Sequence, residues 1–90
     1  MNKYRYEVKQ IDAWLGPDNE WYWNDVYNLG ILTTVAGTKQ GLKKALTMFL
    51  VNHAGILLNS HETRCIYDGD ILEIHDRSTD EPLFAMIPLF

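Results

Sequence analysis

The sequence predicts an α+β domain: an antiparallel sheet of about five strands in the order ββαβββ, with one helix packed on one face. Three observations predict it. Two long segments rich in aromatic and β-branched residues, 4–15 and 20–36, flank a Gly-Pro turn. Apolar residues recur at helical spacing over 39–53, and three shorter apolar segments separated by turn residues follow. At 90 residues, the chain is expected to form a single domain, 1–90.

The first strand, 4–15, contains a change of apolar parity. Tyr4, Tyr6 and Val8 share one side of the strand, whereas Ile11, Ala13 and Leu15 share the other. A parity change inside one strand predicts a bulge near Lys9 and Gln10.

The second strand, 20–36, follows the turn residues 16–19. Pro17 presets φ, and Gly16 and Asn19 tolerate the left-handed conformation, so this stretch predicts a tight turn. Strand alternation then directs Trp21 and Trp23 to one face and Tyr22 to the other. Gly30 is expected to mark a bulge or bend. The two strands should form an N-terminal hairpin.

The helix prediction, 39–53, rests on a start signal, a stripe and a stop signal. Thr38 can cap the first turn with its hydroxyl, and Gly55 supplies a left-handed stop. The stripe consists of residues spaced to lie on one helix face: Leu42, Ala45, Leu46, Phe49, Leu50 and His53.

The C-terminal third predicts three strands. Segments 64–67 and 70–74 flank Asp68-Gly69, a pair favoured in type I′ turns. With these two residues as the loop, Cys65 would face Leu72 and Arg64 would pair with Glu73. A second turn over 77–82 leads to a last strand, 83–87.

Charge and composition exclude several classes of protein. The net charge is −4, acidic residues concentrate after residue 60, and the only basic spot is Lys39, Lys43 and Lys44. No broad basic face is present, so direct nucleic-acid binding is not expected. One cysteine and no long apolar run predict a cytoplasmic protein without a disulfide framework, a signal peptide or a membrane span.

Several short motifs together resemble a group of bacterial proteins. They are Tyr6-x-Val8-x-x-Ile11-Asp12-Ala13-Trp14, Trp21-x-Trp23-Asn24-Asp25, Leu29-Gly30, Tyr67-Asp68-Gly69-Asp70 and Glu81-Pro82-Leu83. Across nearly the whole chain, this pattern looks like small uncharacterised proteins of Gram-positive bacteria and their phages or mobile elements. The resemblance implies a mobile-element accessory protein, and it brings no activity or site residues with it.

The residue pattern predicts no catalytic activity, no metal site and no cofactor. The spacing of His53, His61, Cys65 and His75 fits no zinc motif. Cys65 and His75 have opposite strand parity, so they should not act as a nucleophile and base. Turn chemistry explains Asp68, Asp76 and Asp80, and Asp68-x-Asp70 lacks the ligands of a calcium loop.

The aromatic cluster leaves two interpretations open. Trp21 and Trp23 can pack under the helix around Phe49, as large aromatics often do in small cores, or they can form a binding surface. One helix covers only one sheet face, so one aromatic set should be uncovered and meet a partner. The expected interface residues are Trp21, Tyr22, Trp23, Tyr4, Tyr6 and Tyr27.

The sequence therefore predicts a non-enzymatic accessory module that binds a protein partner or itself, as a homodimer, through an aromatic sheet surface. The alternative is an acidic inhibitor or nucleic-acid mimic that occupies a basic cleft. Docking through apolar groups should persist in salt, whereas charge mimicry should weaken.

Overall fold

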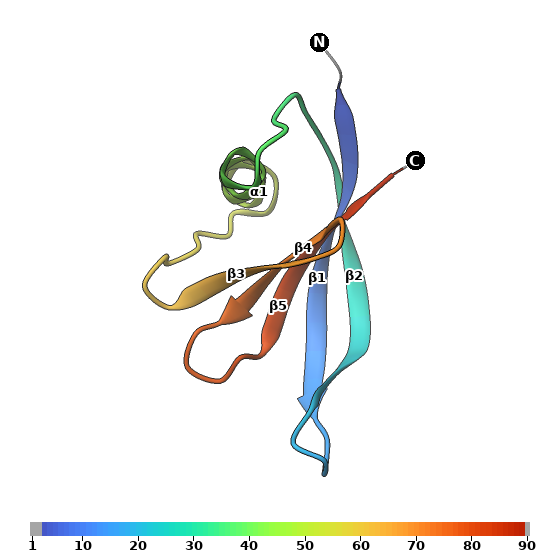
Figure 1. Cartoon of the computed structure of the whole chain (residues 1–90), viewed down its shortest axis with the longest axis vertical. Helices are drawn as coiled ribbons and strands as arrows, with labels where there is room; N and C mark the ends of the chain where they lie inside the picture. Colours follow the sequence, from blue (N-terminus) through green and yellow to red (C-terminus); the bar gives the residue numbers. More distant parts are fainter. Residues whose placement is uncertain (1–2, 90) are drawn as a thin grey trace.

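The computed structural model describes residues 3–89 and confirms the α+β prediction (Figure 1). Five antiparallel strands form one open sheet in the order β2-β1-β5-β4-β3, and one helix lies against it. The elements are β1 Tyr4–Leu15, β2 Trp21–Thr34, α1 Lys39–Ala54, β3 Thr63–Asp68, β4 Ile71–Asp76 and β5 Pro82–Pro88. No helix within residues 3–89 is long and apolar enough to cross a membrane.

Helix α1 begins and ends where local sequence predicts. The Thr38 hydroxyl accepts a hydrogen bond from the Gly41 amide at 3.0 Å, and Gly55 ends the helix with a φ of 66°. Leu46, Phe49 and Leu50 are buried, which confirms the apolar stripe as the packing face. Of the other expected members of the stripe, Leu42 and Ala45 are partly buried against the same core, whereas His53 is exposed.

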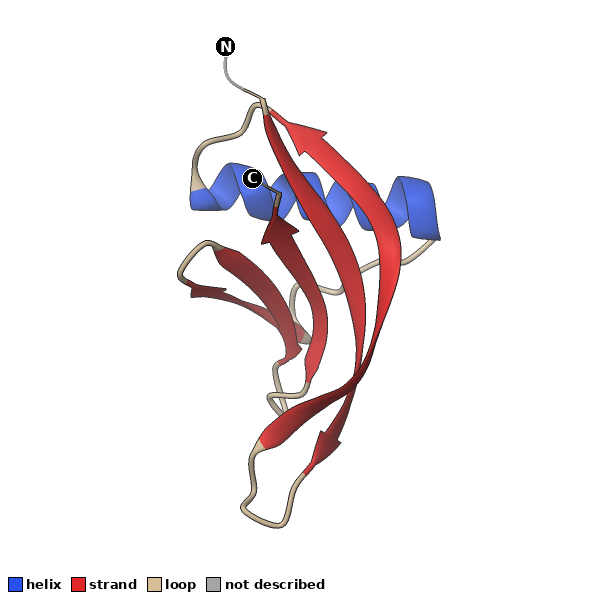
Figure 2. Cartoon of the chain, turned by 90° about the vertical axis from the view of Figure 1, so that its right-hand side faces the viewer, coloured by secondary structure: helices blue, strands red, loops and turns tan. Residues whose placement is uncertain are grey.

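The core lies between α1 and one face of the sheet, which we call the helix face. Four strands contribute its buried side chains: Tyr6, Val8, Leu32, Leu72, Ile74, Phe84 and Met86. Cross-strand pairing aligns them, because Val8 lies between Gly30 of β2 and Met86 of β5. We call the opposite side of the sheet the open face, because no helix covers it (Figure 2).

The expected bulge of the first hairpin belongs to β2 rather than β1. The register shifts between Val8 and Lys9, close to the predicted place, but Leu29 of β2 is the extra residue. A second shift, between Asp12 and Ala13, leaves Asn24 of β2 unpaired. The side chains of β1 alternate between the two faces without interruption. The parity change in the sequence arises because Tyr6 and Val8 are buried on the helix face and Ile11 is buried on the opposite face.

Gly30 adjoins the first bulge and lets α1 approach the sheet. Its φ is 136°, in a region that side chains disfavour. A Cβ atom at this position would lie 3.2 Å from Cζ of Phe49. The bend and the close helix contact therefore occur at the same residue.

The turn between β3 and β4 is one residue later than predicted. Gly69 and Asp70 form the loop, so Cys65 pairs with Ile74 and Arg64 with His75. Only Gly69 of the two has a positive φ, at 61°, which is the type II′ pattern and not the type I′ pattern. The register error is two residues, so each side chain keeps its predicted face.

Candidate protein-docking surface on the first hairpin

The β1–β2 hairpin extends well beyond the helix. We call residues 10–28 the distal hairpin. Figure 2 shows α1 crossing the upper half of the two strands and leaving their lower half without a helix. The molecule is therefore elongated, with extents of 46 × 28 × 22 Å. The interpretation that Trp21 and Trp23 pack under the helix around Phe49 is wrong, because both tryptophans lie in this projecting part of the hairpin.

Aromatic side chains on the helix face of the distal hairpin are exposed. Trp14 and Tyr22 are cross-strand partners whose rings stack with their centroids 5.4 Å apart. The Tyr22 hydroxyl donates a hydrogen bond to the Asp18 carboxylate in the turn. Tyr27 pairs with Gln10 on the same face and is 52% exposed. The turn geometry thus fixes the orientation of one ring pair while leaving its outer surface free.

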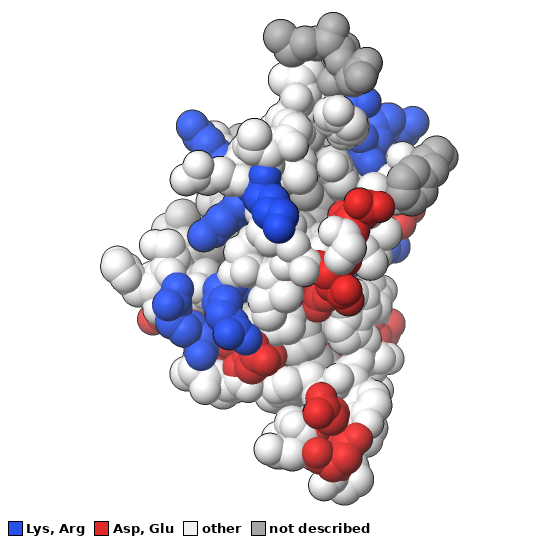
Figure 3. Space-filling model, viewed as in Figure 1, with Lys and Arg blue, Asp and Glu red and all other residues white. Residues whose placement is uncertain are grey.

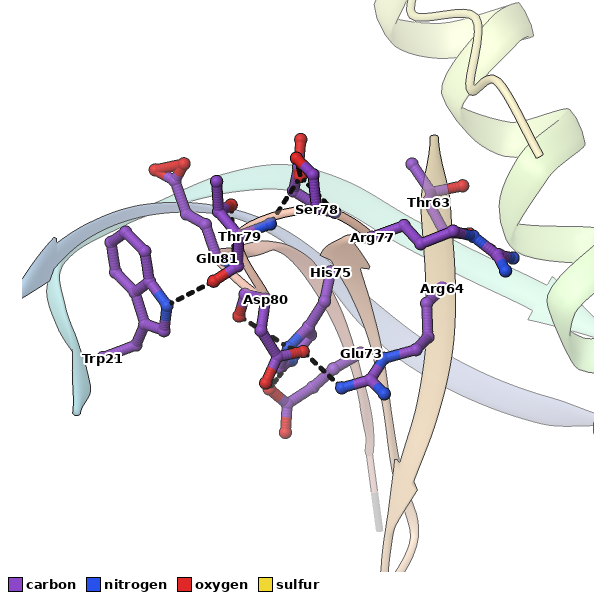
Figure 4. Close-up of polar contacts among 11 residues, drawn as sticks. Trp21, Thr63, Arg64, Glu73, His75, Arg77, Ser78, Thr79, Asp80 and Glu81 are labelled. Atoms are coloured by element: carbon purple, nitrogen blue, oxygen red, sulfur yellow. Dashed lines mark hydrogen bonds and ion pairs between the residues drawn. The ribbon is translucent and has the colours of Figure 1, made fainter. Parts of the chain in front are cut away.

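The open face of the distal hairpin carries the other two tryptophans. Trp21 is half-buried, and its indole N–H donates to the carbonyl of Thr79 at 3.0 Å (Figure 4). This bond ties the hairpin to the turn between β4 and β5. Trp23 is 40% exposed, beside the exposed Val26. Both faces of the distal hairpin therefore present aromatic groups.

The remaining predicted interface residues, Tyr4 and Tyr6, lie at the opposite end of β1. Tyr6 is a core residue, whereas Tyr4 is exposed. Both line a hollow of about 350 Å³ between the start of α1 and the β3–β4 turn, together with Lys39, Tyr67 and Pro88. The six expected residues thus occupy two separate regions, and only Trp21, Tyr22, Trp23 and Tyr27 belong to the distal hairpin.

Strand β2 is one edge of the sheet and contains 14 residues. It has no proline, lysine or arginine, which are common protections of edge strands. Two side chains instead bond backbone amides of the strand. The Asp25 carboxylate accepts from the Val26 amide at 2.8 Å, and the Asn28 side-chain oxygen accepts from the Gly30 amide at 3.0 Å. Two side chains that an incoming strand could displace, together with two bulges, therefore protect this edge from pairing with another strand.

The charge of the distal hairpin is wholly negative. It carries Asp12, Asp18, Glu20 and Asp25, and no basic residue occurs between Lys9 and Lys39. Figure 3 shows acidic groups at this end of the molecule and basic groups nearer the helix. None of these four carboxylates takes part in an ion pair with a described residue.

Neighbouring carboxylates change the acidity of the hairpin phenols. The negative charge of Asp25 is the largest cause that raises the pKa of Tyr27, and Asp12 adds to it. The bond between Tyr22 and Asp18 raises the pKa of the phenol and lowers that of the carboxyl group. The phenol groups on the helix face of the distal hairpin therefore lie in the negative electrostatic field of the neighbouring carboxylates.

A second polar cluster, which the sequence reasoning missed, surrounds His75. Its two ring nitrogens lie 3.0 Å from Oε1 of Glu73 and 3.2 Å from Oδ1 of Asp80 (Figure 4). Arg64 bonds to the same Asp80, and this contact is the main cause that lowers the Asp80 pKa. The i, i+2 spacing of Glu73 and His75 could have indicated their contact. The position of Asp80 depends on the turn, where its φ is 63°.

The His75 cluster serves the structure of the turn. Asp76 next to it accepts hydrogen bonds from the Ser78 and Thr79 amides at 2.8 and 3.0 Å, as expected for a turn residue. No hydroxyl or thiol of residues 3–89 bonds to the His75 ring, and Cys65 lies on the opposite face. The cluster orders the turn that receives the Trp21 indole.

The described part of the chain contains no group of three or more His, Cys, Asp or Glu side chains arranged to hold a metal ion. A comparison of the chain with protein-family models, curated proteins and solved structures found no match.

Proposed function

We propose that this protein is a non-enzymatic docking module that binds another protein through the distal hairpin. One observation carries the proposal. Four aromatic side chains beyond the reach of the helix are each at least 40% exposed: Trp14, Tyr22, Trp23 and Tyr27. Large exposed apolar groups concentrated in one part of a molecule are typical of interaction surfaces.

Aromatic side chains suit this role for physical reasons. Each ring presents a large apolar area with few rotatable bonds, so little conformational entropy is lost when it is covered. Tyr and Trp also dominate the binding energy of many protein interfaces. The stacked Trp14 and Tyr22 rings are preorganised by the Asp18 turn, which reduces the ordering cost further.

Self-association through the same surface is the simplest form of this function, with an isologous dimer as the product. Occupation of a basic cleft, in the manner of an acidic inhibitor or nucleic-acid mimic, is the second candidate. It is favoured by the four carboxylates of the distal hairpin, which form no ion pair among residues 3–89. The resemblance to phage and mobile-element proteins suits either role.

Site-specific photocross-linking in cells that naturally make the protein would test docking. A photoreactive phenylalanine analogue replaces Tyr27, and the matched control carries the same group at Leu57, which is 84% exposed and lies outside the hairpin. We expect one discrete cross-linked protein with the Tyr27 probe and not with the control. Addition of the unlabelled protein should compete for it. Equal cross-linking at both sites, or none at Tyr27, would contradict the proposal.

A further inference from the structure

We propose, building on the docking function above, that the partner contributes an extended segment rich in lysine or arginine, which adds to the free edge of β2 as a further strand. The segment alternates, with basic side chains on one face and apolar side chains on the other. Residues 21–28, a stretch about 27 Å long, form the receiving edge.

The free length of β2 selects this edge. The other edge strand, β3, has only six residues and carries Arg64 and Asp68. On β2, the contact of Phe49 with Gly30 places α1 over the upper part of the strand, whereas residues 21–28 have no helix over them. The bulge at Asn24 divides this stretch, so regular pairing is confined to 25–28, with the aromatic residues 21–23 beside it.

The alternation of β2 determines what an added strand must present. Tyr27 and Asp25 lie on the helix face, where Asp25 pairs with Asp12 of β1. Val26 and Trp23 lie on the open face, which has no carboxylate on this part of β2. Neighbouring strands place their side chains on the same two faces. A complementary strand therefore carries basic groups beside Tyr27 and Asp25, and apolar groups beside Val26 and Trp23.

Charge favours this occupant over a second copy of the chain. Two distal hairpins paired edge to edge would bring eight carboxylates together with no base, since each hairpin has four acids. A basic segment instead gains ion pairs, and it gains cation–π contacts with exposed phenol and indole faces. Complementary charge also accelerates encounter and disfavours acidic strands.

Asp25 links the charge to the backbone edge. Its carboxylate accepts the Val26 amide hydrogen in the free protein. An arriving strand must displace that carboxylate to use the amide, and a lysine or arginine side chain of the partner then receives the displaced charge. An uncharged strand offers no such compensation, so the Asp25 carboxylate stays bonded to the Val26 amide and blocks pairing with that strand.

Tryptophan fluorescence provides the test, because all three tryptophans lie in the distal hairpin. The probe is a synthetic ten-residue peptide that alternates arginine and valine. One control has the same composition with the arginines in a block, and another replaces arginine with glutamate. We expect the alternating peptide to bind at least about tenfold more tightly than either control, and its affinity to fall with added salt. Asp25→Asn should weaken this binding several-fold, whereas Asp68→Asn on the other edge should not.

Equal binding of the blocked peptide, or an unchanged affinity in Asp25→Asn, would overturn the added-strand proposal. Circular dichroism would establish that both variants retain the fold. If the peptide does not bind while the Tyr27 cross-linker still captures one protein, docking stands and the basic strand is wrong. Failure of both experiments would reject both proposals.

Discussion

Phe49 packs closely against the sheet at Gly30, beside the buried Leu46 and Leu50 of the same helix. Its ring is buried, meets the bare backbone of Gly30, and stacks on His53 with the ring centroids 4.5 Å apart. The apolar spacing predicted its burial. Its partner could not be predicted from that spacing, because the positive φ of Gly30 arises where β2 bulges against β1.

Phe49→Ala should destabilise the protein by about 3–5 kcal/mol, because the substitution leaves a cavity under the helix. Val51→Ala is the matched control, since Val51 lies on the exposed side of α1. That control should stay within about 0.5 kcal/mol. Chemical denaturation of both variants measures the difference, and a loss below about 1 kcal/mol for Phe49→Ala would contradict the core described above.

Tyr67 makes the fold sensitive to high pH. Burial is the largest cause that raises its pKa from 10.0 to about 12, and its hydroxyl donates to the Lys39 carbonyl. The folded pKa lies above the unfolded one, so the contribution of Tyr67 is fully present below pH 10 and is lost as the pH rises towards 12.

Tyr67→Phe should therefore reduce the loss of stability between about pH 9.5 and about pH 11.5, a range that includes the unfolded pKa of 10.0 and most of the interval up to the folded pKa of about 12. Denaturation curves at both pH values, for the variant and the unchanged protein, measure the two slopes. The same pH slope in both proteins would contradict this role of Tyr67.

Features that depend on neighbouring residues, such as the helix ends, were predicted more accurately than features that depend on strand pairing. The helix ends depend on Thr38 and Gly55, which act within one turn, and both were identified. The bulged residues of β2 depend on how β1 pairs, and a single strand does not show this. The β3–β4 loop admitted two registers, and the positive φ of Gly69 is compatible with both types of turn.

Gly69→Val should destabilise the β3–β4 hairpin by about 1–2 kcal/mol, because a β-branched residue resists a positive φ. No heavy atom lies within 4 Å of a Cβ built on Gly69, so the penalty comes from the backbone alone. Gly69→Asn should cost less than Gly69→Val, since Asn is not β-branched and adopts a positive φ more readily. Equal costs for the two variants in urea denaturation would show that φ does not determine the effect.

Asp25→Ala should increase self-association of the protein. The substitution removes a charge from the distal hairpin and frees the Val26 amide, so both protections of this edge are lost together. Asp68→Ala, at the end of the other edge strand, is the control. Sedimentation velocity at several concentrations measures the mass of each, and a variant that stays as monomeric as the control would count against the guarding role.

In the molecule as a whole, the helix crosses the upper half of the first hairpin and leaves its lower half uncovered (Figure 2). Strand parity correctly separated Trp21 and Trp23 from Tyr22, but parity does not say how far along a strand the helix reaches. The sequence therefore identified the aromatic residues as a candidate surface, but it did not predict that they lie far from Phe49. The two strands continue past the core (Figure 1). They carry exposed aromatic and acidic side chains next to the free edge of β2.

Hydrogen exchange followed by mass spectrometry tests most directly whether this free edge is the docking surface. The protein is measured alone and with the partner identified by cross-linking. We expect binding to slow exchange within residues 21–28 of β2 and to leave β3, at the other edge of the sheet, unchanged. Protection confined to β3 or α1, with unchanged exchange in residues 21–28, would show that the free edge of β2 is not the docking surface.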